Sequence, residues 1–144
     1  MKTQNDRMKA GRMKAVLISL AFMLPSAVMA GTDIDQTVSM SADGLVQVEN
    51  MAGSVEFTAW DRNEAQVRGE AGDSVEEVII RETSGGVLVK IRNRKNQRNM
   101  DGTDLFLRIP ARASIEGDGV SSDFTVRGSN GETITINTVS GDVE

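Results

Sequence analysis

The chain has 144 residues, of which 16 are basic and 21 acidic, and it contains no cysteine and no histidine. These absences exclude a disulfide framework, a thiolate metal site and the usual general base near neutral pH. The acidic balance disfavours non-specific binding to nucleic acid, so we expect no nucleic-acid partner.

Residues 1–30 are predicted to be a secretory signal peptide. Lys9, Arg12 and Lys14 precede an apolar run over 15–24, and small residues follow it, which is the three-part layout of such a leader. The run has ten residues, whereas a bilayer core requires about 20. We therefore expect an exported protein, periplasmic or at the cell surface, with no transmembrane segment once the leader is cleaved.

The remaining chain, residues 31–144, is predicted to be all-β. No segment keeps a helical period, and turn-forming residues interrupt the chain about every eight to twelve residues. Apolar and polar residues alternate in several short runs, as in half-buried strands. Two of the runs, joined by Ser84-Gly85-Gly86, are typical of an antiparallel hairpin. The expected strands are 45–50, 55–60, 65–69, 75–83, 87–92, 105–109 and 133–138, with a surface loop over 93–103 and a loose leading segment or first edge strand over 31–44.

The last 25 residues contain a short repeat. Val120-Ser121-Ser122-Asp123 is echoed 19 residues later by Val139-Ser140-Gly141-Asp142, with a strand-like run between the two copies. A step of about 20 residues with small, polar corners is typical of a β-solenoid coil. We therefore predict a short right-handed β-solenoid-like stack over residues 45–144, with at least one antiparallel hairpin. Because the second copy is cut short at Glu144, we expect this stack to be incomplete.

Three short motifs occur in an order that resembles a known family. They are Asn50 to Phe57 leading into Ala59-Trp60-Asp61, then Leu107-Arg108-Ile109-Pro110, and then Val139-Ser140-Gly141-Asp142-Val143. Together they resemble the family of adhesin-like bacterial domains of unknown function, over roughly residues 45–144. The resemblance implies a β-solenoid fold, frequent export or attachment to the cell envelope, and no established catalytic residues. Two positions depart from the family pattern, since Ala59 and Ser122 stand where members often carry glycine.

Two features could contact a ligand. Trp60 is expected to be a packing residue or a partly exposed contact for a sugar ring. A basic cluster in one predicted loop could bind phosphate or carboxylate groups of envelope lipid or polysaccharide. The favoured alternative for this cluster is a solvated loop. Its members are Arg92, Arg94, Lys95 and Arg98.

Small and acidic residues are expected to shape the corners of the coil. Asp118, Asp123 and Asp142 could instead line one edge and bind Ca²⁺, which takes six to eight oxygen ligands. Their spacing misses the known calcium repeats, and aspartate commonly serves turns by bonding its own backbone. We therefore predict no metal site and no cofactor. The predicted corner residues are Gly53, Asp123, Gly141 and Asp142.

The sequence predicts an exported, non-enzymatic interaction domain, whose partner is an unknown envelope protein or polysaccharide. The first alternative is a carbohydrate-active enzyme on a solenoid scaffold, in which two carboxylates would act as acid and base. The second alternative is an accessory protein in envelope stress signalling. The candidate acid pairs are Asp33/Asp35, Asp101/Asp104 and Glu76/Glu77.

Overall fold

The computed structural model describes residues 33–96, 98 and 101–144, so the predicted signal peptide lies outside the described residues. Within these ranges every regular element is a strand, which confirms the all-β prediction. None of the described residues belongs to a helix able to cross a membrane. The strands are β1 (Asp33–Ser39), β2 (Leu45–Trp60), β3 (Glu64–Glu70), β4 (Val75–Glu82), β5 (Val87–Asn93), β6 (Thr103–Pro110), β7 (Ser114–Arg127) and β8 (Ile134–Asn137).

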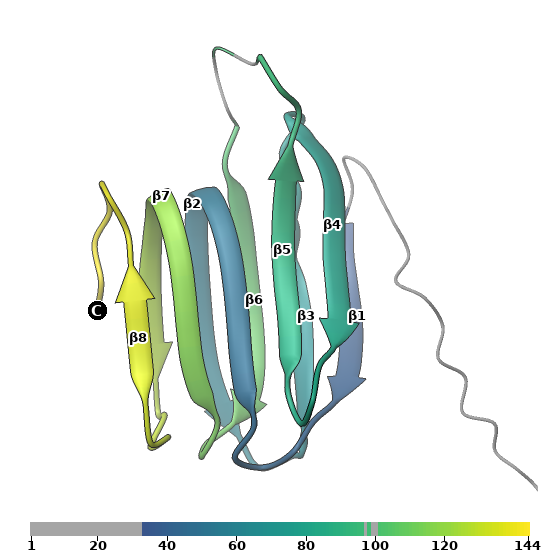
Figure 1. Ribbon diagram of the computed structural model, residues 1–144, viewed down its shortest axis with the longest axis vertical. Helices are drawn as coiled ribbons and strands as arrows, with labels where there is room; N and C mark the ends of the chain where they lie inside the picture. Colours follow the sequence, from purple (N-terminus) through teal and green to yellow (C-terminus); the bar gives the residue numbers. More distant parts are fainter. Residues whose placement is uncertain (1–32, 97, 99–100) are drawn as a thin grey trace, which may run out of the picture.

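The two longest strands, β2 and β7, connect two layers of sheet. They run side by side along most of their length, and both curve over the top of the molecule in Figure 1. The first half of β2 pairs with β5 and the second half with β6. The front layer therefore has the order β4-β5-β2-β7-β8, and the rear layer has the order β1-β3-β6-β2-β7.

Strand directions in this sheet are mixed. The strands β5, β6 and β7 run parallel to β2, and β8 runs parallel to β7. The pairs β1–β3, β3–β6 and β4–β5 are antiparallel, and the last of these confirms the predicted hairpin. A coil-like parallel stack thus runs from β5 and β6 through β2 and β7 to β8. The predicted right-handed solenoid does not describe the whole domain, because tight connections such as residues 83–86 return the chain antiparallel.

The segment before residue 45 is an edge strand and not a loose lead-in. Of the two expectations for residues 31–44, the edge strand is correct, since β1 pairs with β3 from Asp33 to Ser39. The side chains of Ile34 and Met40 reach the buried core. This strand lies near β4 at the end of the molecule away from β8, so the sheet nearly closes around its core.

The predicted break at residues 51–54 is a bend inside one continuous strand. Buried positions switch from Val46 and Val48 before the bend to Val55 and Phe57 after it, so both halves keep an apolar side inward. Gly53 lies at the bend with a φ of 116°, and a Cβ there would lie 2.2 Å from the carbonyl oxygen of Thr103. Only glycine combines this conformation with so close an approach.

The same corner occurs three times in the stack. Leu45 pairs with Ser114 and Thr58 with Arg127, a constant offset of 69 residues, and Ile115 pairs with Ile134, an offset of 19. The repeat seen in the sequence comprises only the second and third copies, because the first copy differs more from them in sequence. Aligned by register, the copies are Met51-Ala52-Gly53-Ser54, Val120-Ser121-Ser122-Asp123 and Val139-Ser140-Gly141-Asp142.

Polar side chains inside the corner bond the backbone of the neighbouring rung. The Asn50 side chain donates to the carbonyl of Thr103 at 3.0 Å, and the Ser122 hydroxyl donates to the carbonyl of Asn50 at 2.5 Å. The Thr138 hydroxyl in turn donates to the carbonyl of Ser122 at 3.1 Å. This corner ladder satisfies carbonyls that would otherwise be buried without a partner at the bend. The ladder also accounts for serine at position 122, where the family pattern often has glycine. The Ser122 side chain is fully buried and hydrogen-bonded.

The hydrophobic core lies between the two layers. Phe57 and Phe124 are its largest fully buried side chains, and they come from the rear halves of β2 and β7. The Phe124 ring reaches across to Gly117, where a Cβ would lie only 2.8 Å from the ring. Glycine at 117 therefore makes room for the larger side chain, which holds the two halves of β7 together.

Candidate functional site

The outward side of the rear layer carries an exposed aromatic residue at its centre. In β6 the side chains of Leu105, Leu107 and Ile109 point inward, so alternation directs Phe106 to the solvent, where it is 53% exposed. Phe106 pairs in register with Arg68 of β3 and Glu56 of β2. The sequence analysis did not single out this residue, although its place in the alternating run contained the signal.

A half-open hollow of about 370 Å³ lies around Phe106. This volume is near the lower end of the range for small-molecule sites, about 300–1,000 Å³. Side chains from three neighbouring strands line it, so the hollow is built on sheet and not on loops. Besides Leu107, the lining residues are Glu56, Thr58, Gln66, Arg68, Phe106 and Arg108.

Trp60 stands beside this hollow as a half-buried residue at the end of β2. Its indole nitrogen donates to the carbonyl of Glu64 at 2.8 Å. The guanidinium groups of Arg62 and Arg108 lie 5.3 and 5.9 Å from the ring centroid, within cation–π range. The ring thus packs against arginine, which restricts the orientation of Arg108 and competes with the sugar stacking expected for Trp60.

Three arginines follow the same surface, with different partners. Arg68 lies 3.5 Å from Asp35, and Arg127 lies 3.5 Å from Glu56, both as largely exposed ion pairs. Such pairs contribute little, typically about 0–1 kcal/mol, and rearrange readily. Within the described part of the chain, no carboxylate forms an ion pair with Arg108. The hollow therefore combines an apolar ring, one carboxylate and guanidinium groups available to a ligand.

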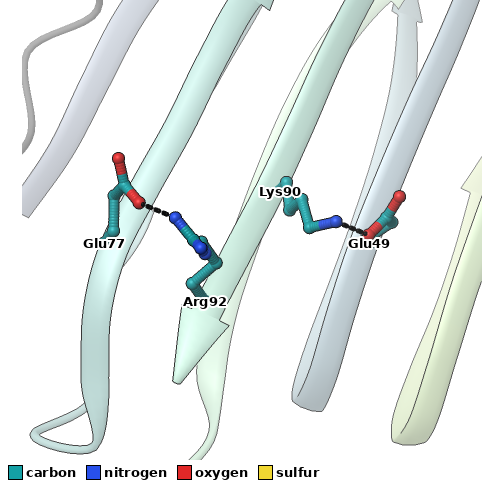
Figure 2. A network of polar contacts seen from close by, with 4 residues as sticks. All are labelled: Glu49, Glu77, Lys90 and Arg92. Carbon is teal, nitrogen blue, oxygen red and sulfur yellow. Dashed lines mark hydrogen bonds and ion pairs between the residues drawn. The ribbon is translucent and has the colours of Figure 1, made fainter. Parts of the chain in front are cut away.

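The predicted basic cluster is split between a strand and a loop. Arg92 lies within β5, and its guanidinium donates to the Glu77 carboxylate at 2.6 Å. Figure 2 shows this pair beside a second one across the front layer, in which Lys90 lies 2.9 Å from Glu49. The hydrogen bond from Arg92 to Glu77, together with the charge of Glu77, raises the pKa of Arg92 above its ordinary value. Arg92 is thus paired, and the exposed loop holds Arg94, Lys95 and Arg98.

The predicted corner residues all lie at bends of the stack. A backbone amide, that of Asp142, donates to the Asp123 carboxylate at 2.9 Å, one rung further along. At Gly141 a Cβ would lie 2.1 Å from the carbonyl oxygen of Ser122. The third aspartate considered for calcium, Asp118, accepts a hydrogen bond from Asn137 at 3.0 Å. These contacts link successive rungs through the aspartates.

The acid pairs considered for catalysis do not line the hollow, although Asp35 lies beside it through its ion pair with Arg68. Asp33 and Asp35 are on the edge strand β1, and Asp104 accepts a hydrogen bond from Ser54 at 2.8 Å. Glu77 is held by Arg92 on the front layer. Across the residues with described positions, no three histidine, cysteine, aspartate or glutamate side chains are grouped for a metal ion.

Comparison with known proteins finds similarity in structure alone. No protein-family model matches the chain, and a search of curated proteins finds no match. A proposed cell adhesion protein of Clostridium sporogenes has a TM-score of 0.56 at 7% identity, over 78% of this chain and 58% of that chain. This similarity shows a shared fold, and it agrees with the adhesin-like resemblance at the level of fold.

Two further solved structures are more distant. A proposed adhesin of Bacteroides fragilis has a TM-score of 0.43 at 12% identity, over 77% of this chain and 61% of that one. A proposed adhesin of Parabacteroides merdae has a TM-score of 0.43 at 8% identity, over 75% and 44%. The chain therefore spans less than two thirds of the length of each of these proteins.

Proposed function

We propose that the protein is an exported, adhesin-like domain that binds a ligand of the cell envelope or cell surface without transforming it. The observation that carries this proposal is the exposed Phe106 at the centre of the hollow on the rear layer. A large aromatic side chain exposed among hydrogen-bonding groups is typical of a recognition surface, because aromatic rings dominate binding energetics.

The shape of the site favours binding over chemistry. The hollow is half open to solvent, and its lining includes a single carboxylate, Glu56, which Arg127 approaches. Hydrolysis of a glycan by acid–base catalysis ordinarily uses two carboxylates that flank the bond. A flat, sheet-based surface instead suits an extended partner such as a polymer or another protein face.

The proposal of export rests on two supports. The leader over 1–30 has the layout of a signal peptide. The structural neighbour from Clostridium sporogenes is itself a proposed cell adhesion protein. Both supports favour a ligand among components of the envelope or the cell surface.

The test is binding of the chain without its leader to purified envelope polysaccharides, envelope proteins and a glycan array. We expect a bound ligand and at least a tenfold loss of affinity in Phe106→Ala, about 1.4 kcal/mol. The matched control is Leu88→Ala, a truncation of an outward side chain on the opposite layer, which should bind normally. Equal losses in both variants, or no ligand in any panel, would contradict the proposal. Shortened oligosaccharides after incubation would support the enzyme alternative instead.

A further inference from the structure

We infer that the hollow recognises a hexuronate unit of an acidic polysaccharide, with Phe106 against the sugar ring and Arg108 on its carboxylate. This inference rests on the proposed function, because it names the class of ligand for the same site.

The charges around the hollow favour a ligand that carries a carboxylate. The leader holds five of the 16 basic and one of the 21 acidic residues, which leaves 11 basic and 20 acidic residues in the rest of the chain. Against this acidic background, the hollow region gathers three arginines, of which Arg68 pairs with Asp35 and Arg127 with Glu56, while Arg108 forms no ion pair with a described residue. Charges beyond about 8 Å are screened at physiological salt, so a carboxylate bound in the hollow interacts mainly with these arginines and not with the net charge.

The ring of Phe106 requires an apolar partner surface. Phenylalanine offers no hydrogen bond, so its gain on binding comes from covering the exposed ring. One face of a pyranose ring presents C–H groups and can cover it, while the sugar hydroxyls point to the rim. At that rim the exposed hydroxyl of Thr58 can donate to and accept from a sugar hydroxyl, while the Gln66 side chain lines the hollow with its Oε1 buried.

The guanidinium of Arg108 is oriented for a carboxylate. Its packing over the Trp60 ring limits its freedom, so less entropy is lost when a ligand binds. No carboxylate among the described residues neutralises it, and a planar guanidinium matches a carboxylate in a bidentate arrangement. In the strand register, Arg108 lies between Thr58 and Gln66. The side chains that would contact the carboxylate and the hydroxyl groups of the sugar therefore lie in one row across the sheet.

A polysaccharide fits this surface better than an acidic peptide. The hollow is centred on solvent-facing side chains of β3, β6 and β2, whose backbone groups are already paired in the sheet. A peptide added as an extra strand would need a free sheet edge. A sugar chain needs only the ring and side-chain partners that the hollow presents.

The experiment is calorimetric titration with oligogalacturonate and oligomannuronate, and with the same oligomers after chemical reduction of their carboxyl groups to alcohols. We expect at least one acidic oligomer to bind at least about tenfold more tightly than its reduced form, as a charge-assisted bidentate contact implies. Arg108→Gln should remove that preference and Phe106→Ala should weaken both forms. Arg108→Lys should retain only part of the preference for the acidic oligomer, because lysine cannot bind the carboxylate through two parallel hydrogen bonds.

The matched control is Arg81→Gln, which removes an exposed arginine from the front layer and should leave binding unchanged. Circular dichroism and thermal unfolding establish that each variant is folded. Equal affinity for acidic and reduced oligomers would overturn this inference while leaving the proposed function intact, provided that Phe106→Ala still weakens binding. Binding of hexaglutamate but of no oligosaccharide would overturn the sugar assignment. Absence of any Phe106-dependent ligand would overturn both proposals.

Discussion

The buried hydroxyl of Ser122 is the residue on which the corner ladder depends. Its bond to the carbonyl of Asn50 is made where no water can replace it. Removing the hydroxyl should leave that carbonyl unsatisfied, so Ser122→Ala should lower the free energy of unfolding by about 1–3 kcal/mol. Denaturant titration measures this loss. The control is Ser121→Ala at the exposed neighbouring position, where we expect a change within about 0.5 kcal/mol.

Gly53 and Gly128 allow two reasons for a glycine to be compared, namely a positive φ and a lack of space for a Cβ. Both have positive φ, but a Cβ at Gly53 would lie 2.2 Å from the Thr103 carbonyl oxygen, whereas a Cβ at Gly128 would lie 3.5 Å from its nearest neighbour, the Cβ of Ala59. Alanine at 128 should cost only the conformational strain, about 1–2 kcal/mol. Alanine at 53 should cost more, because the backbone of β6 must also move. Comparing the two unfolding free energies tests this order, and equal losses would show that conformation alone decides.

Residue patterns predicted the small residues of the corners but not their partners. Gly53, Asp123, Gly141 and Asp142 were identified from turn preferences, which are local. The bond that Ser122 makes to Asn50 spans 72 residues, and no local preference contains it. In the site, Phe106 could have been found from alternation in β6. Its neighbours Arg68 and Glu56 depend on strand register, which a single sequence does not specify.

The strands differ in how many neighbours hold them. β2 is paired on both sides along most of its length, whereas β8 pairs with β7 alone and its Ile134 side chain is exposed. Local opening costs least where few contacts are lost. Amides of β8 should therefore exchange with solvent much faster than those of β2. Hydrogen exchange followed by mass spectrometry measures this, and similar protection of the two strands would contradict the expected gradient.

At the scale of elements, alternation predicted most strands but not their pairing. Residues 45–60 were divided into two strands because 51–54 resemble a turn, yet β2 bends there without ending. The reason is that β6 and β7 continue to pair with it beyond the bend. The step of 19 residues was correct for β7 and β8, where the copies are adjacent in sequence. The step of 69 from β2 to β7 was hidden by the intervening strands.

Across the whole molecule, acidic side chains align in one row of the rear layer. Register places Asp33 beside Glu70 and Glu70 beside Asp104, while Ser54 separates Asp104 from Asp123. Neighbouring strands are about 4.8 Å apart, and like charges directly opposite are destabilising by roughly 0.2–1 kcal/mol. Among the paired positions described for these strands, no basic residue occupies this row, so dissolved ions screen its charges.

This row predicts that salt stabilises the protein. Raising the ionic strength from about 0.01 M to about 1 M shortens the Debye length from about 30 Å to about 3 Å and should weaken the repulsion. The melting temperature in sodium chloride should therefore rise. Glu70→Gln removes the charge between two acidic neighbours, so it should raise the melting temperature at low salt and reduce its dependence on salt. Glu82→Gln is the control, since Glu82 pairs in register with Val87 and should change the salt dependence little. A melting temperature that falls with salt, or an equal response of both variants, would show that this row does not govern the charge balance.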